Sequence, residues 1–134
     1  MRKGPFFILS EFSPVFKVTK PAYNSKTRLC MITALVQFKL PKPVTMEQAR
    51  GIFLGTAPKY HNSPGLIRKY YLLSQDGSTA GGVYLWKSLE DTEHLYSDDW
   101  KAFILEKYEA LPSVTFFDTT VVVDNLTHQI IADD

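Results

Sequence analysis

Short runs of β-forming residues alternate along the chain with segments whose apolar residues recur at helical spacing. Four runs rich in Val, Ile, Leu, Thr, Tyr and Phe predict strands, because these residue types suit a pleated, partly buried surface. Two segments predict helices, because their apolar residues recur three and four positions apart. The predicted strands are residues 31–39, 66–74, 80–87 and 114–124, and the predicted helices start near residues 46 and 98. This order, β-α-β-β-α-β, is typical of the α+β, ferredoxin-like arrangement with an antiparallel sheet.

Capping residues mark where the two predicted helices begin. Thr45 stands three residues before Gln48, the spacing of a capping box, in which each side chain accepts a hydrogen bond from the other residue's backbone N–H. Ser97 precedes the second helix, and Asp98 and Asp99 place negative charge in its first turn. One face of this helix is expected to be buried, and it is formed by Trp100, Phe103, Ile104 and Tyr108.

The predicted strands lack the apolar–polar alternation that a sheet with one wet face requires. The runs without alternation are residues 32–36, 70–73 and 121–123. Both faces of the sheet therefore need cover, and two helices can cover only one of them. An identical sheet in a twofold dimer is the most economical cover for the second face. The sequence thus predicts a homodimer.

Composition limits the class of protein, and the distribution of charge divides the chain near residue 30. The 134 residues are 45% hydrophobic and 13% aromatic, which suffices for the core of one ordinary domain. The net charge is +1, but residues 1–30 hold six basic groups and one acidic group, so residues 31–134 carry a net negative charge. We expect residues 1–30 to be a weakly ordered arm or extension and residues 31–134 to be the functional domain. The near-neutral balance argues against nucleic acid as a partner.

Features of targeting, membrane insertion and disulfide bonding are weak or missing in the sequence. The chain starts with basic residues and an apolar run, but Glu11 and Pro14 interrupt that run before any cleavage site. The longest apolar runs have four or five residues, far too few for a membrane span. Cys30 is the only cysteine, which excludes a disulfide within the chain and a cysteine-based zinc site. We therefore expect a cytoplasmic protein with no membrane partner.

Short motifs in the second part of the chain resemble the dimeric α+β barrel superfamily. They are a domain opening at Met31, Pro64-Gly65-Leu66 before the second strand, and Ala80-Gly81-Gly82-Val83-Tyr84-Leu85 in the third. Within this superfamily the chain is most similar to the mono-oxygenases of the YdhR-like type, by strand order and turn position over residues 31–131. The resemblance implies a dimer whose two four-stranded sheets form a shared barrel. It also implies a pocket between each sheet and its helices.

Comparison with a haem-degrading branch of the same superfamily indicates whether the chain has the residue needed to bind haem. Trp86-Lys87-Ser88 and Ser97-Asp98 resemble that branch and set a register, in which Leu105 stands where an iron-ligating histidine is required. Leucine has no lone pair to offer iron, so haem is not expected. The sequence also lacks flavin-binding, phosphate-binding and metal-binding motifs. We therefore expect a protein that uses no cofactor and holds no metal.

Eight residues are candidates for a site, and each of them also has a purely structural explanation. His61 is the titratable group of most interest, because it follows the first helix just before a turn, although a surface histidine is the structural alternative. Lys69 suits the mouth of a pocket, where it would hold a phenolate, or a solvated position at the edge of a sheet. The aromatic candidates are also typical core residues. The catalytic candidates are His61, Tyr71 and Trp86, and the substrate-pocket candidates are Gln37, Asn62, Lys69, Tyr84 and Trp100.

The resemblance implies an oxidoreductase, a cofactor-independent mono-oxygenase that oxidises a small phenol, quinol or anthrone-like compound with O₂. Such an enzyme uses the substrate as its own reductant, so the protein must supply a base, an aromatic slot and protection from water. Two alternatives stay open. One is a non-catalytic small-molecule binding or stress-related dimer, and the other is an isomerase or decyclase on the same fold.

Overall fold

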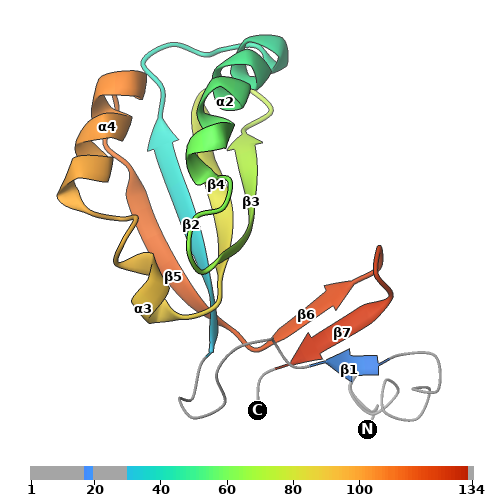
Figure 1. Ribbon diagram of the computed structural model, residues 1–134. Coiled ribbons are helices and arrows are strands. Elements are labelled where there is room, and N and C mark those ends of the chain that lie inside the picture. The colour runs from blue at the N-terminus through green and yellow to red at the C-terminus, as the bar shows by residue number, and fades with distance from the viewer. Residues whose placement is uncertain (1–16, 20–29, 133–134) are drawn as a thin grey trace, which may run out of the picture. The chain divides into compact units, whose positions relative to one another are not determined.

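The computed structural model describes residues 17–19 and 30–132 (Figure 1). The expected arm over residues 1–30 lies almost entirely outside these residues, and the division of the chain at residue 30 stays a prediction. The chain forms two compact units, which are described separately. The larger unit is Cys30–Asp118, and the smaller one contains the described strand near residue 18 together with the described residues from Thr119 onward.

The larger unit is a four-stranded sheet with two long helices on one face (Figure 1). Its elements are β2 (Met31–Lys39), α2 (Met46–Tyr60), β3 (Leu66–Leu73), β4 (Thr79–Trp86), α3 (Leu89–Thr92), α4 (Asp98–Tyr108) and β5 (Ser113–Thr119). The strand order is β3-β4-β2-β5, and β4 runs antiparallel to both β2 and β3. The predicted α+β, ferredoxin-like order is therefore confirmed, with α3 as a short addition before α4.

The two long helices start where the sequence predicts, and the turn between β3 and β4 lies at Asp76-Gly77, a pair of residues that predicts a hairpin turn. Thr45 Oγ1 accepts a hydrogen bond from Gln48 N–H at 3.1 Å, and Gln48 Oε1 accepts one from Thr45 N–H at 2.9 Å. Ser97 caps α4 through its hydroxyl oxygen. The hairpin between β3 and β4 turns at Gly77 with φ of +76°, where a Cβ would strike the carbonyl oxygen of Val44. The start of α2 is thereby held beside this hairpin.

The core lies between the sheet and the two long helices. Alternate side chains of β2 and β4 point toward the helices and are almost completely buried. From the predicted face of α4, Trp100 and Ile104 are buried, while Phe103 and Tyr108 are half-buried and pack against the core. The buried cluster consists of Ile32, Ala34, Val36, Phe38, Tyr60, Ala80, Tyr84, Trp86, Trp100 and Ile104.

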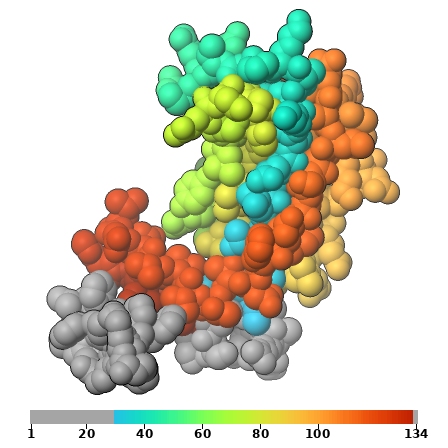
Figure 2. Space-filling model, turned by 180° about the vertical axis from the view of Figure 1, so that it is seen from behind, coloured from blue at the N-terminus to red at the C-terminus, as the bar shows by residue number. Residues whose placement is uncertain are grey.

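The other face of the sheet is covered by neither α2 nor α4. Figure 2 shows the strands of the larger unit from this side. Leu35 of β2 pairs with Val83 of β4, which in turn pairs with Tyr70 of β3, so these three apolar side chains lie side by side across the sheet. Tyr70 is 54% exposed, and Leu35 and Val83 are half-buried. This row of side chains across the open face is therefore apolar, as the lack of alternation in the strands predicts.

The smaller unit is a three-stranded sheet that the sequence did not predict. Its strands are β1 (Lys17–Thr19), β6 (Val121–Asp124) and β7 (Gln129–Ala132), in the order β1-β7-β6. The prediction of one strand over residues 114–124 is wrong, because the strand is interrupted at Thr120, and a further strand, β7, follows a turn. Asp124 Oδ1 accepts hydrogen bonds from the N–H groups of Leu126 at 3.0 Å and Thr127 at 3.3 Å, which closes this turn.

Three further observations concern membrane insertion, metal binding and thiol chemistry. Among the helices of the described residues, none is long and apolar enough to cross a membrane. No group of three or more His, Cys, Asp and Glu side chains in residues 17–19 and 30–132 is arranged to hold a metal ion. Cys30 is a half-buried free thiol.

Candidate functional site

The ammonium group of Lys69 lies among aromatic rings. Its Nζ is 3.3 Å from the ring centroid of Tyr60, 3.9 Å from that of Tyr71 and 4.5 Å from that of Tyr84. Within the described part of the chain it has no hydrogen-bond or ion-pair partner. Burial lowers the pKa of Lys69 from 10.5 to about 7, because the ring faces replace only part of the hydration of a cation. Near neutral pH, Lys69 is therefore present partly as a neutral amine.

An irregularity in β3 explains why Lys69 faces the helices. Leu66 pairs with Trp86, but Arg68 pairs with Leu85, so one extra residue is accommodated between Leu66 and Arg68. Side chains of a regular strand alternate between faces, and such a bulge reverses the alternation beyond it. As a result both Leu66 and Lys69 point toward the helices, followed by Tyr71.

Tyr71 borders the lysine and is held in place by two contacts. Its ring stacks on Phe53 of α2, with centroids 4.7 Å apart and an interplanar angle of 20°. Its hydroxyl lies 2.8 Å from Thr56 Oγ1, which itself donates to the carbonyl oxygen of Phe53 at 3.1 Å. Since the threonine hydrogen is used in that bond, the hydroxyl of Tyr71 is the donor to Thr56. Burial raises the pKa of Tyr71, and the residue stays a neutral hydrogen-bond donor at neutral pH.

The aromatic side chains deeper in the core form a closed cluster. Trp86 Nε1–H donates to the hydroxyl of Tyr96 at 2.9 Å, and Trp100 Nε1–H donates to the hydroxyl of Tyr60 at 3.1 Å. Tyr84 packs edge-on against Tyr60 and stacks on Trp86, and its burial strongly raises its pKa. Both buried indole donors are thus satisfied within the core.

A groove opens beside Lys69 between the end of α2 and strand β3, and we call it the Lys69 groove. It has a volume of about 350 Å³, and Tyr60, His61, Asn62, Lys69 and Tyr71 are among the residues that line it. The space behind Lys69, between the sheet and both helices, is nearly filled, with a volume of about 10 Å³. That volume holds one water molecule at most. A ligand therefore reaches the lysine from the groove.

The structure brings together most of the candidates that the sequence suggests. His61, Asn62, Lys69 and Tyr71 line the Lys69 groove, with His61 and Asn62 exposed at the end of α2. Tyr84 and Trp100 lie behind the lysine and border the filled space. Two candidates lie elsewhere. Trp86 is 1% exposed and packs against Tyr84 and Tyr96, and Gln37 is exposed on the sheet face that the helices leave open.

Tyr60 and Thr56 contribute to the site, although the sequence indicates only that they lie on one face of a predicted helix. They are four residues apart on α2, so both point toward the sheet. Tyr60 contacts Lys69 with its ring and accepts the hydrogen bond from Trp100 with its hydroxyl. Helical spacing finds this face, but it does not show which strand residues the face meets.

Comparisons with known proteins support the fold. No protein-family model and no curated protein sequence matches the chain. Among solved structures, one similar protein is a candidate antibiotic biosynthesis monooxygenase from Caulobacter crescentus, with a TM-score of 0.53 and 20% identity. The match covers 69% of this chain and 92% of that one.

Two further similar structures are oxygenases from Streptomyces. SnoaB from Streptomyces nogalater, a cofactor-independent oxygenase, has a TM-score of 0.53 and 13% identity, over 72% of this chain and 99% of its own. The monooxygenase from the gene ActVA-Orf6 of Streptomyces coelicolor, solved in complex with nanaomycin D, has a TM-score of 0.52 and 19% identity, over 72% and 93%. At this identity the comparisons show that the chain has the fold of these monooxygenases. The expected α+β, ferredoxin-like fold is thereby confirmed.

Proposed function

We propose that the protein is a homodimeric mono-oxygenase that oxidises a small aromatic substrate with O₂ and without a bound cofactor. The observation that carries this proposal is the position of Lys69, which faces both an open groove and a wall of tyrosine rings and has no counter-ion among the described residues. The two Streptomyces structures support it, since one is a cofactor-independent oxygenase and the other a monooxygenase. The phenol, quinol or anthrone-like class of substrate fits the aromatic lining.

Lys69 is the proposed general base. As a neutral amine it accepts a proton from the acidic carbon or hydroxyl of the substrate, and the ammonium group that results lies beside the substrate anion. For an anthrone, the carbanion transfers electrons to O₂, and the resulting peroxide anion takes the proton back from the Lys69 ammonium group to form a hydroperoxide at the same carbon. Loss of water then leaves a carbonyl group. One oxygen atom of O₂ enters the product and the other leaves as water, so the substrate supplies all the electrons.

Tyr71 and His61 have supporting roles in this proposal. Tyr71 donates its hydrogen bond to Thr56, and its ring forms one wall of the groove. His61 and Asn62, at the end of α2, offer hydrogen bonds to polar substituents of the substrate. Tyr84 and Trp100 shield the lysine from water on its inner side. Trp86 supports the packing of Tyr84.

Oxygen consumption tests the proposed reaction. The full-length protein, dialysed against a chelator, is assayed with anthrone and hydroquinones in an oxygen electrode. We expect oxygen uptake that falls about 100-fold or more in Lys69→Met, the size of effect typical of a lost general base. Lys107→Met, which removes a lysine in the last turn of α4, is the matched control. Equal rates in Lys69→Met and the wild type would exclude this role for the lysine, and ligand binding without any uptake would favour a non-catalytic binding protein.

The open face of the sheet supports the homodimer. Leu35, Tyr70 and Val83 form an apolar surface across three strands, where a second copy of the same sheet would exclude water. Val83→Lys places a charge in the middle of this surface, and we expect it to convert the dimer to a monomer in light scattering. Leu111→Lys, at a residue that is 70% exposed after α4, is the control. A monomeric wild type at micromolar concentration would refute the dimer.

A further inference from the structure

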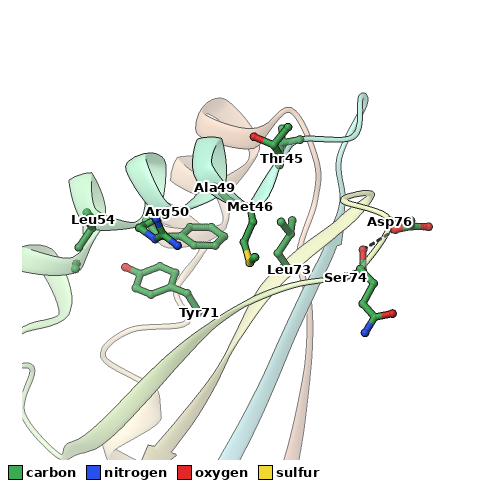
Figure 3. A pocket seen from close by; sticks show the side chains of 13 residues that line it. Thr45, Met46, Ala49, Arg50, Leu54, Tyr71, Leu73, Ser74 and Asp76 are labelled. Carbon is green, nitrogen blue, oxygen red and sulfur yellow. Dashed lines mark hydrogen bonds between the residues drawn. The ribbon is translucent and has the colours of Figure 1, made fainter.

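A second and larger groove lies between α2 and the β3–β4 hairpin, and we call it the hairpin groove. Its volume is about 770 Å³, which lies within the range of small-molecule sites. Figure 3 shows Met46 and Arg50 reaching from α2 toward Tyr71 and Leu73 of β3. The hairpin groove therefore lies along the same helix as the Lys69 groove, and Ala57 and Tyr71 line both of them.

The walls of the hairpin groove are mainly apolar. From α2 they include Met46, Ala49, Phe53 and Leu54, and from β3 they include Leu73. Met46 is 70% exposed and Leu54 is 65% exposed, although both side chains are large and apolar. Large apolar side chains that are gathered and exposed around one cavity mark a site for an apolar ligand.

The polar groups of the hairpin groove are arranged asymmetrically. Arg50 is exposed, and no hydrogen bond or ion pair with any described residue involves it. Asp76 lies at the opposite end (Figure 3). Its Oδ1 accepts hydrogen bonds from Ser74 Oγ at 2.7 Å, Ser78 N–H at 3.0 Å and Ser78 Oγ at 2.7 Å. These bonds hold the pKa of Asp76 at about 2. One end of the groove thus carries a cation that has no partner in the described part of the chain, and the other end carries a carboxylate that is hydrogen-bonded within its own turn.

We propose that the hairpin groove is a second ligand site, which binds a small apolar carboxylate with its anionic group on Arg50. A guanidinium group offers two parallel N–H donors that match a carboxylate, and here no side chain of the described residues competes for them. The apolar body of the ligand lies on Met46, Leu54 and Leu73. The charge of Asp76 at the far end disfavours the reverse orientation. This inference goes beyond the proposed reaction and does not depend on turnover.

Calorimetric titration with 2-naphthoate and its neutral analogue 2-naphthamide tests the site. We expect the wild type to bind 2-naphthoate more tightly than the amide. Arg50→Gln should weaken 2-naphthoate binding about tenfold, as expected for lost hydrogen bonds to a charged group, and should leave binding of the amide unchanged. Lys107→Gln removes the same charge from α4 and should affect neither probe.

A second pair of variants tests the apolar wall. Leu54→Ala should weaken the binding of both probes to a similar extent. Because Leu54 is highly exposed, this variant should keep its fold. Ile52 lies on the same helix but does not line this groove, so Ile52→Ala should not weaken the binding of either probe. No binding of 2-naphthoate, or equal binding to Arg50→Gln and the wild type, would overturn the proposal. Loss of binding in Lys69→Met with full binding in Arg50→Gln would also overturn it, because the probe would then occupy the Lys69 groove.

Discussion

Two clusters of aromatic side chains pack on the same face of the sheet, and they differ in how their polar atoms are satisfied. Around Trp86 and Tyr96, the indole N–H has a hydroxyl acceptor at 2.9 Å, and Trp86 is buried while Tyr96 is half-buried. Around Tyr60 and Tyr71, by contrast, a lysine lies on the ring faces without an acceptor among the described residues. The first cluster stabilises the fold, whereas the second maintains a polar group at a cost to stability.

This contrast shows that aromatic residues alone do not define a site. Aromatic rings occur in both clusters, and Tyr96 of the first cluster also lines a groove, of about 440 Å³. Among the described residues, however, no buried lysine lies on the rings of Trp86 and Tyr96. The cluster at Lys69 has an incompletely solvated amine, a groove of about 350 Å³ beside it and a lowered pKa. A group that destabilises the fold and is nevertheless accessible is a candidate for function. Substitutions in the two clusters should therefore have effects that differ in kind as well as in size.

The largest effect on stability is expected in the closed cluster. Trp86→Ala removes a side chain that is 1% exposed, and the free energy of unfolding should fall by about 3–5 kcal/mol, through lost burial and the cavity that remains. Urea denaturation followed by circular dichroism measures this. Leu111→Ala, at a 70% exposed residue, should change it by less than about 0.5 kcal/mol. A similar loss of unfolding free energy in Trp86→Ala and Leu111→Ala would show that the cluster around Trp86 is not part of the core.

The sequence predicts the elements of the larger unit well, because their signals are local. The capping box at Thr45 and the hairpin turn at Gly77 depend on residues only a few positions apart, and both are found as expected. The smaller sheet is missed because its strand at residues 17–19 pairs with one more than a hundred residues later. Similarly, the bulge after Leu66 decides that Lys69 faces α2, and pairing register is not visible in the sequence.

A smaller effect, opposite in sign, is expected for Lys69 as pH rises. The unfolded chain keeps the lysine proton up to about pH 10.5, whereas the folded protein loses it near pH 7. Between these values the unfolded state binds more protons, so stability increases with pH, by at most about 1.4 kcal/mol per pH unit. Because the side chain is only half-buried and partly screened, we expect a gain of about 1–2 kcal/mol between pH 7 and pH 9.

Comparing Lys69→Met with the wild type separates the contribution of Lys69 to the pH dependence of stability from that of other titratable groups. Lys69→Met removes the group, so its unfolding free energy should lack the gain that the wild type shows over the same pH range. At pH 7 it should also be more stable than the wild type, because a desolvated cation is replaced by an apolar side chain. Lys107→Met should follow the wild type. A parallel pH dependence in wild type and Lys69→Met would show that the lysine is solvated.

Effects of about the same size are expected from the two tyrosine hydroxyls that accept the indole hydrogen bonds. Tyr96→Phe leaves Trp86 Nε1–H without its acceptor, and Tyr60→Phe does the same for Trp100. Each change should lower the free energy of unfolding by about 1–2 kcal/mol. Of the two tyrosines, only Tyr60 contacts Lys69 and lines its groove, and it contacts the lysine with its ring. The ring is retained in Tyr60→Phe, so the lysine keeps its cation–π contact and the oxygen uptake measured for the wild type should persist in both variants. A large loss of uptake in Tyr60→Phe alone would assign the hydroxyl, rather than the ring, to the reaction.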